Sequence, residues 1–152
     1  MQIGSGPSLQ WYDFAELSTT LLYEMLRFRQ AIFVVEQACA YPDLDGIDQR
    51  THHLMLHVDG ALAGYLRLIP FPDANRVAIG RVAVAVDRRQ QGLARRLMAE
   101  ALTRCRGDYR KSAITLSAQT YLTAFYAELG FRPSSPPYDD YGVPHIDMLI
   151  DP

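Results

Sequence analysis

The sequence predicts a mixed α/β fold in which helices flank a sheet of antiparallel and parallel strands. Several short segments alternate apolar and polar residues or are rich in β-branched residues, which is typical of strands. Other segments carry apolar residues at helical spacing. The order is strand, helix, antiparallel strands, then strand, turn and helix, which differs from a strict βαβ repeat. With 152 residues, 49% of them hydrophobic, the chain is the size of a single domain, residues 1–152.

The amino-terminal part predicts a strand followed by a core helix. Residues 9–14 alternate apolar and polar side chains, as a half-buried strand does. Ser18 or Thr19 can cap the helix that follows. The apolar side of this helix extends to Phe33 and includes Arg29, so we expect it to face the core.

The next segments predict a β-hairpin and no metal site. Residues 53–58 and 61–69 are predicted strands, and Asp-Gly at 59–60 is a strong signal for a tight hairpin between them. His53 shares a face with another histidine, but no acidic or cysteine partner stands at ligand spacing, so a partly exposed side chain is expected. The acidic segment 42–48 lacks the closing glutamate of a calcium loop. A solvated turn or one wall of an amine-binding pocket is expected there.

The central stretch is a predicted strand, turn and helix. Residues 77–86 are rich in β-branched residues and predict a buried strand, and the polar residues 87–91 predict a turn. From Leu93 to Cys105 the apolar residues fall on one face of a helix, which Gly107 is expected to end as a C-cap.

The carboxy-terminal part predicts another helix among strands. Residues 113–117 predict a short strand, and residues 121–129 predict a helix that Gly130 stops. Phe131 opens a further strand, and residues 145–150 are the last strand.

The turn into the central helix has the chemistry of a phosphate-binding site. A helix start leaves several backbone N–H groups without partners and carries partial positive charge. Gly92 and Ala94 let an anion approach the backbone, and Arg89, Arg95 and Arg96 add full charges. The lysine of a P-loop and the three glycines of a dinucleotide fingerprint are both missing. The turn therefore predicts a phosphate or pyrophosphate site, with an ordinary basic surface turn as the alternative.

Several stretches together resemble one enzyme superfamily. Arg89-Gln90-Gln91-Gly92-Leu93-Ala94 is similar to the Arg/Gln-x-x-Gly-x-Gly/Ala loop that binds the acetyl-CoA pyrophosphate in GNAT N-acetyltransferases. Residues 117–119 and 124–131 resemble the second block of that superfamily. The run Phe33-Val34-Val35-Glu36-Gln37 is the most specific part of a nearly end-to-end resemblance to the ElaA-like GNAT proteins.

The resemblance implies a fold, a co-substrate and binding residues. The implied fold is the GNAT acyl-CoA N-acyltransferase fold, a mostly antiparallel, splayed central sheet flanked by helices. The implied co-substrate is acetyl-CoA, without a metal, and the acetyl group passes directly to a primary amine of unknown identity. Main-chain groups of the central strand would pair with the pantetheine amides and supply an oxyanion donor. The implied cofactor-binding residues are Val82, Ala83, Val84, Arg89, Gln90, Gln91, Gly92, Leu93, Ala94, Arg95 and Gln119.

Two residues are the candidate catalytic groups. By resemblance, Tyr126 is the acid that serves the departing thiolate, and packing in the core is the alternative. Glu36 is the predicted base, because partial burial after an apolar run would raise the pKa of its carboxyl. A structural ion pair of Glu36 with Arg29 or Arg81 is the alternative. Other residues stay open as the base: Asp43, Asp45, His53 and His145.

Composition limits the partners and the location. A net charge of −2 gives no general attraction to nucleic acid. No apolar run reaches the roughly 18 residues of a membrane span, and no secretory signal is visible. Two well-separated cysteines predict free thiols and a cytoplasmic protein.

The expected partner is a small-molecule or peptide amine. A non-catalytic acyl-CoA sensor is the alternative function, and the oligomeric state stays open, a homodimer included.

Overall fold

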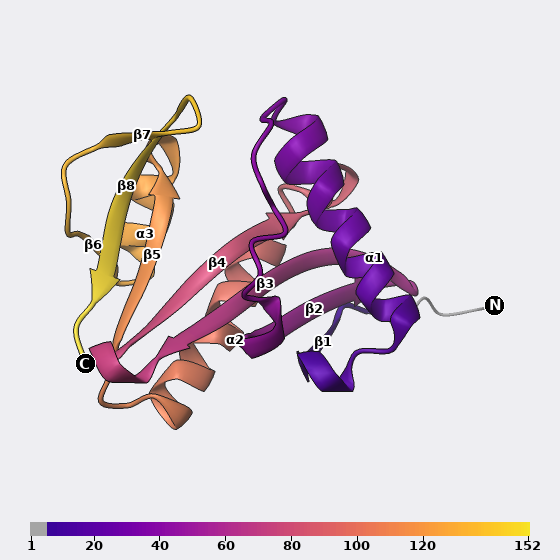
Figure 1. Ribbon diagram of the computed structural model, residues 1–152, viewed down its shortest axis with the longest axis horizontal. Helices are drawn as coiled ribbons and strands as arrows, with labels where there is room; N and C mark the ends of the chain where they lie inside the picture. The colour runs from indigo at the N-terminus through magenta and orange to yellow at the C-terminus, as the bar shows by residue number, and fades with distance from the viewer. Residues whose placement is uncertain (1–5) are drawn as a thin grey trace.

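The computed structural model describes residues 6–152, which form a mixed sheet with helices on both faces (Figure 1). The mixed α/β fold predicted from the sequence is confirmed. Within these residues the strand order is β1-β2-β3-β4-β5-β8-β6, and β7 pairs with β8. The strands are β1 (Ser8–Asp13), β2 (His52–Val58), β3 (Ala61–Phe71), β4 (Arg76–Val84), β5 (Ala113–Gln119), β6 (Arg132–Pro133), β7 (Tyr138–Asp140) and β8 (Val143–Ile150). The helices are η1 (Phe14–Glu16), α1 (Thr19–Arg29), η2 (Gln30–Glu36), η3 (Asp48–Arg50), η4 (Pro72–Ala74), η5 (Val86–Arg88), α2 (Leu93–Asp108), η6 (Thr120–Leu122) and α3 (Thr123–Glu128).

The sheet divides in the middle, between β4 and β5. These strands pair in parallel from Arg76 with Ala113 to Ala78 with Thr115. Beyond Ala78 they diverge, so that β1 to β4 form one arm of a fork and β5 to β8 form the other (Figure 1). The other strand pairs of the described residues are antiparallel, as the expected mostly antiparallel, splayed sheet requires.

Helices α1 and α2 cover opposite faces of the first arm (Figure 1). On the α2 side, Leu97 packs into the main core with strand residues such as Leu66. On the α1 side, Met25 forms a second buried cluster with Met55 of β2 and Tyr65 of β3. Because helices bury both faces of the central strands, these strands are almost continuously apolar in sequence.

The first helix changes its winding before it reaches the cavity described below. The Ser18 side chain caps α1 by accepting a hydrogen bond from the Leu21 N–H at 3.1 Å. Beyond Arg29 the chain continues as the π-helix η2, which ends with the Gln37 N–H bonded to the Ile32 carbonyl at 3.2 Å. The predicted helix therefore extends past residue 33, and its last part is wider than an α-helix. Such π-segments are rare and are frequent at functional sites.

Strand β4 contains a bulge directly beyond the division of the sheet. Two residues of β4, Arg81 and Val82, lie opposite the single residue Leu66 of β3. Arg81 has a φ of +54°, a left-handed conformation that costs a non-glycine residue about 1–2 kcal/mol. The extra residue also changes which side chains face α2. Ile79 packs toward α2 before the bulge, and Val82 packs there after it.

Several predicted boundaries are wrong by one to a few residues, and the ends of β4 and α2 are two of them. Strand β4 ends at Val84 rather than at residue 86, because the chain turns into η5. Helix α2 continues through Gly107, and Tyr109 is its C-cap, with its N–H donated to the Cys105 carbonyl at 2.9 Å. The half-buried ring of Tyr109 packs against the main core, so tertiary contacts extend the helix past its glycine.

Arginine and aspartate side chains form a buried ionic network that joins the end of α1 to β3 and β4. Arg29 donates to Asp43 at 3.1 Å and to Asp48 at 2.8 Å. Arg67 donates to Asp48 at 2.8 Å. The solvated turn expected at residues 42–48 is confirmed for the exposed residues 44–46, but it is wrong for Asp43 and Asp48, which are buried with their charges paired inside the protein. The members of the ionic network are Arg29, Arg67, Arg81, Asp43, Asp45 and Asp48.

His53 is attached to the same network. Its Nδ1 lies 2.6 Å from the Tyr65 hydroxyl, and its Nε2 lies 2.9 Å from the Asp48 carbonyl. The carbonyl can only accept, so Nε2 carries the proton and Nδ1 accepts from the tyrosine. The side chain is fully buried, so the expected partial exposure of His53 is wrong.

We expect the stability of the fold to fall in acid in two steps. Burial lowers the pKa of His53, so the unfolded chain binds its proton more readily, and stability is lost as the pH falls below about 6.5. Burial opposes ionisation of Asp45, but hydrogen bonds and charge from Arg67 outweigh it and lower its pKa to about 2. The stability from Asp45 is therefore present above about pH 4 and is lost toward pH 2. Urea midpoints measured across this range test both steps, and His53→Gln should lose the first one.

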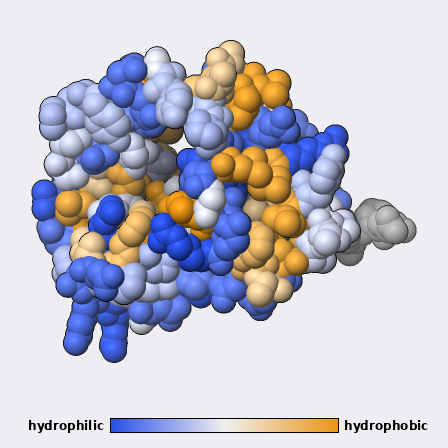
Figure 2. All heavy atoms as spheres, viewed as in Figure 1, coloured by the Kyte–Doolittle hydropathy of each residue, from blue (hydrophilic) through white to orange (hydrophobic). Residues whose placement is uncertain are grey.

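The surface carries an apolar area along the first helix. Figure 2 shows apolar residues gathered over α1 and in the floor of the hollow beside it. Tyr23 and Val35 are among the exposed large hydrophobic residues of this part of the chain.

Among residues 6–152, no helix combines the length and apolarity that crossing a bilayer requires.

Candidate active site

A cavity of about 830 Å³ opens where β4 and β5 diverge. Its walls come from η2, β4, the start of α2, β5, α3 and the hairpin of β7 and β8. The structure brings the predicted site residues together here, with the exception of Gln91, which does not line the cavity. The predicted residues that line it are Glu36, Val82, Ala83, Val84, Arg89, Gln90, Gly92, Leu93, Ala94, Arg95, Gln119 and Tyr126.

The β4 side of the cavity presents main chain. After Ala78, no strand within residues 6–152 pairs with the edge of β4 that faces β5. The Val84 carbonyl accepts from the Arg89 Nε at 3.1 Å, and Val82 lies within the bulge. An open strand edge offers N–H and C=O groups at regular spacing, so it can pair with an extended ligand that carries amides.

The turn before α2 presents backbone amides. In the described part of the chain, the N–H groups of residues 90–95 have no hydrogen-bond acceptor, and the Arg96 N–H is the first to bond, to the Gly92 carbonyl at 3.1 Å. Gln90 and Gly92 have φ values of +62° and +77°. A β-carbon added to Gly92 would meet no atom within 4 Å, so the space in front of these amides is open. This arrangement fits an anion such as a pyrophosphate.

An ion pair spans the cavity between Glu36 of η2 and Arg89 of the turn. Arg89 Nη2 donates to Glu36 Oε2 at 2.7 Å, and Nη1 donates to the other carboxylate oxygen. Hydrogen bonding to Arg89 lowers the pKa of Glu36. The expected partial burial with a raised pKa is wrong, because Glu36 is exposed and already paired. Arg29 and Arg81, the ion-pair partners suggested from the sequence, both contact Asp43 instead.

Three arginines that line the cavity, Arg88, Arg89 and Arg95, flank the start of α2, and a fourth, Arg81, lies on β4. Arg95 Nη2 donates to Glu128 Oε2 of α3 at 2.7 Å, and the Arg95 guanidinium lies 5.6 Å from the centre of the Phe125 ring. Arg88 lies 3.7 Å from Asp59. Exposed pairs of this kind contribute little to stability, so these cations remain available to an anionic ligand.

Tyr126 of α3 lies in the wall of the cavity. Its ring is 6% exposed and meets Phe125 and Phe131 edge to face, with ring centres 5.1 and 6.1 Å away. Its hydroxyl has no hydrogen-bond partner within residues 6–152. Burial raises the pKa of Tyr126 to about 12, so the phenol is protonated at neutral pH and can donate a hydrogen bond. Tyr126 is therefore packed in the core and also presented to the cavity.

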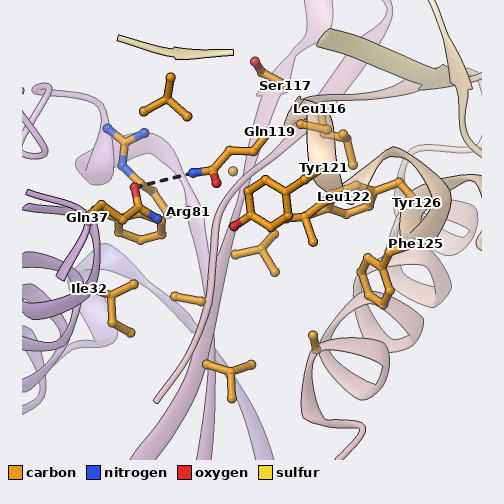
Figure 3. Close-up of a pocket in the computed structure, with 18 of the residues that line it drawn as sticks. Ile32, Gln37, Arg81, Leu116, Ser117, Gln119, Tyr121, Leu122, Phe125 and Tyr126 are labelled. Carbon is orange, nitrogen blue, oxygen red and sulfur yellow. Dashed lines mark hydrogen bonds between the residues drawn. The ribbon is translucent and has the colours of Figure 1, made fainter. Parts of the chain in front are cut away.

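Gln37 and Tyr121 also line the cavity, and neither is among the site residues predicted from the sequence. In Figure 3, Gln119 of β5 reaches across to Gln37, and its Nε2 donates to the Gln37 Oε1 at 3.4 Å. Tyr121 points its hydroxyl into the same space, and the side chain is 76% exposed. Gln37 and Gln119 are 82 residues apart in sequence, and no local pattern indicates that they meet.

The structure separates the remaining candidate bases. Asp43, Asp45 and His53 belong to the ionic network or its margin and do not line the cavity. His145 of β8 does line it. Its Nδ1–H donates to the Val143 carbonyl at 2.8 Å, and its Nε2 has no hydrogen-bond partner within residues 6–152.

The cysteines and acidic residues do not form a metal centre within residues 6–152, where no group of three or more His, Cys, Asp or Glu side chains converges. Both cysteines are free. Burial raises the pKa of Cys105 to about 11, which makes this thiol inert. Cys39 lines the cavity, and its Sγ lies 3.6 Å from the Tyr141 carbonyl.

Comparison with known proteins assigns the chain to a family. The family model described as the acetyltransferase (GNAT) domain matches residues 27–152. The chain belongs to the GNAT acetyltransferase family. Protein ElaA of Escherichia coli (strain K12) is 36% identical over 145 residues, which cover 92% of this chain and 95% of ElaA. The resemblance to ElaA-like GNAT proteins inferred from the sequence is therefore confirmed.

Solved structures agree with this assignment. The chain is similar to an acyl-CoA N-acyltransferase from Pseudomonas aeruginosa, with a TM-score of 0.90, 37% identity, and coverage of 95% of this chain and 99% of that one. The crystal structure of E. coli ElaA has a TM-score of 0.89 at 35% identity, over 94% of this chain and 98% of that one. A GNAT acetyltransferase from Elizabethkingia anophelis with acetyl-CoA bound has a TM-score of 0.69 at 14% identity, over 96% of this chain and 98% of that one, and shares the fold. Membership of the GNAT family supports acyl-CoA-dependent acyl transfer as the general activity.

Proposed function

We propose that the chain is an acetyl-CoA-dependent N-acetyltransferase that moves an acetyl group directly to a primary amine. The observation that carries this proposal is that the open edge of β4 and the free amides before α2 line one cavity. The strand edge can pair with the amides of an extended chain, and the free N–H groups can bind a diphosphate. Coenzyme A contains an amide-bearing chain and a diphosphate one after the other. The acetyl-CoA-bound structure with the same fold supports this reading.

The chain's own residues fit the parts of acetyl-CoA. The amides of residues 90–95, with Arg89 and Arg95, would hold the pyrophosphate. The main chain of residues 82–84 would pair with the pantetheine amides and direct one N–H at the acyl oxygen. When bound, acetyl-CoA supplies the acyl group as an activated thioester.

Tyr126 is proposed to stabilise the departing sulfur. A thiol has a pKa near ~8.5, well below the pKa of about 12 of this phenol. Complete proton transfer from Tyr126 to the thiolate is therefore uphill, and the phenol acts mainly by donating a hydrogen bond as negative charge develops. A water-excluding wall formed by the rings of Phe125 and Phe131 strengthens that bond.

The acceptor amine must lose a proton before or during attack, because an alkylammonium has a pKa near ~10.4. Glu36 was the base predicted from the sequence, and its lowered pKa makes it a weak base while Arg89 holds it. His145 lines the cavity wall, and in the neutral imidazole the Nδ1–H bond to the Val143 carbonyl makes Nε2 the basic nitrogen. We therefore propose His145 as the base and keep Glu36 as the second candidate.

Free thiol release tests the proposal. The protein is incubated with acetyl-CoA and a panel of small amines, polyamines and peptides, and released coenzyme A thiol is followed against a reaction without amine. At least one amine is expected to raise thiol release well above the background. The same assay on His145→Gln and Glu36→Gln distinguishes the two candidate bases.

A matched control removes the protein's own side-chain amine. Lys111 is the single lysine of the sequence and is exposed, so Lys111→Arg excludes transfer to this side chain as the source of thiol. Tight binding of acetyl-CoA without thiol release from any amine would contradict the proposal and favour the non-catalytic acyl-CoA sensor.

The proposal also covers the cellular location of the enzyme, its domain organisation and the class of its acceptor. The free state of Cys39 and Cys105 supports a reducing, cytoplasmic location. The contiguous sheet supports a single-domain enzyme, and the polar residues around the cavity support a small-molecule or peptide amine as the acceptor.

A further inference from the structure

We propose that Asp43 and Arg81 are positioning residues for acyl transfer, whose ion pair fixes the β4 bulge so that its main-chain amide points at the acyl oxygen. Asp43 does not line the cavity, whereas Arg81 does, and both are proposed to act through the backbone of the bulge rather than by contact with the substrate. The inference rests on the proposed function, because the bulge amide matters only if an acyl group is presented to it.

The bulge stands where β4 first meets the cavity. Pairing with β5 stops at Ala78, and the residues that follow on β4 line the cavity wall. A bulge rotates the peptide planes of its residues relative to the strand. The direction of the Val82 N–H therefore depends on the left-handed conformation of Arg81, whose φ is +54°.

An arginine is an unfavourable residue for this conformation. Bulges with a left-handed first residue ordinarily place glycine there, because glycine has no β-carbon to strain the backbone. The surrounding structure must therefore hold the backbone of Arg81, and the contacts of its own side chain add to the pairing of β3 and β4 on either side of the bulge.

The side chain of Arg81 is fixed by a buried carboxylate. Arg81 Nε donates to Asp43 Oδ1 at 2.8 Å, and its Nη2 donates to the Asp43 carbonyl at 3.2 Å. The guanidinium lies 5.1 Å from the centre of the Tyr41 ring, and the Tyr41 hydroxyl donates to the same Asp43 oxygen at 3.0 Å. Asp43 is therefore a fixed anchor for the bulge.

Asp43 is itself held from the opposite side. Arg29 Nε donates to Asp43 Oδ2 at 3.1 Å, and the Arg29 side chain is fully buried. Both carboxylate oxygens are engaged, and neither reaches the cavity surface. The contacts thus connect the rigid end of α1 to the bulge through one aspartate.

The test compares two replacements of Arg81. Arg81→Ala removes the side chain and keeps the strain, whereas Arg81→Gly removes the side chain and favours the left-handed conformation. The readouts are kcat, KM and the ¹³C shift of the carbonyl carbon in bound [1-¹³C]acetyl-CoA, which reports polarisation by the bulge amide. We expect Arg81→Ala and Asp43→Asn to lower kcat about tenfold at nearly unchanged KM and to move the ¹³C signal toward its free value. Arg81→Gly is expected to stay within about threefold of the wild-type kcat and to keep the shift.

Asp48→Asn is the matched control. Asp48 belongs to the same ionic network and bonds Arg29 and Arg67, but it does not contact Arg81. Both aspartate variants should lower the urea midpoint, and only Asp43→Asn should lower kcat and move the ¹³C signal.

Several results would overturn the inference. If Arg81→Gly loses as much kcat and ¹³C shift as Arg81→Ala, the arginine side chain itself acts on the substrate. If Asp48→Asn matches Asp43→Asn in kcat, the network acts through stability alone. The ¹³C measurement needs no acceptor amine, so it tests positioning even if thiol release shows that the proposed transfer does not occur.

Discussion

Replacing Tyr126 with phenylalanine is expected to lower the rate of acyl transfer about 10- to 100-fold, at or below the lower end of the range of about 10²–10⁴-fold for general acid catalysis. The loss stays in this range because a thiolate is a fair leaving group without an acid. The affinity for acetyl-CoA should not change, because the hydroxyl is proposed to interact only as charge develops on the sulfur. Steady-state rates and calorimetric titration of the variant with coenzyme A separate the two effects.

The fold of this variant should be intact. The Tyr126 hydroxyl has no partner within residues 6–152, and the ring contacts with Phe125 and Phe131 remain in phenylalanine. Tyr121→Phe is the matched control, because its hydroxyl points into the same cavity from an exposed ring (Figure 3). An unaltered rate in Tyr126→Phe, or an equal loss in Tyr121→Phe, would remove Tyr126 from its proposed role.

Elements set by local chemistry could be predicted from the sequence. Asp59 and Gly60 both have positive φ, at +52° and +80°, as the predicted tight hairpin requires. The apolar face of α2 is buried along its length, from Leu93 to Cys105. In both cases the deciding interactions lie within a few residues, so the pattern in the sequence contains them.

The ionic network could not be predicted, because its contacts join distant parts of the chain. Arg29 bonds Asp43 and Asp48, which are 14 and 19 residues away. Read alone, residues 42–48 have the composition of a solvated turn. Only Asp43 and Asp48 of this segment are buried, and three arginines that the fold brings to one place pair with them, so tertiary pairing overrides the local preference at these two residues.

In the candidate site, too, local features could be predicted from the sequence and long-range contacts could not. The open amides near Gly92 follow from a strand, a turn and a helix that are adjacent in sequence, so they could be anticipated. The pairing of Glu36 with Arg89 spans 53 residues and was missed. The bulge at Arg81 was missed as well, because an arginine gives no local signal for a left-handed residue.

Replacing Gly92 with glutamate is expected to abolish binding of coenzyme A, a loss of at least about 100-fold, or about 2.7 kcal/mol. The new carboxylate would stand among the free amides of residues 90–95, where the pyrophosphate is proposed to bind. Like charges at such distances repel strongly in a partly dry site. A β-carbon at Gly92 meets no atom within 4 Å, so the cost to the fold is the backbone strain of a side chain at a φ of +77°, about 1–2 kcal/mol.

Two control variants separate the causes of this loss. Gly92→Ala tests the strain of a β-carbon at a φ of +77° without adding charge, and we expect it to weaken binding far less. Gly107→Glu adds the same charge to the same helix at its exposed far end, also in open space, and should leave binding unchanged.

The central claim is that main-chain amides around Gly92 bind the diphosphate of an acyl-CoA whose thioester then reacts with an amine. Calorimetric titration of the wild-type protein and Gly92→Glu with coenzyme A tests it most directly. The account predicts saturable one-to-one binding by the wild type and none detectable by the variant. Equal binding by both proteins, or no binding by the wild type, would contradict it.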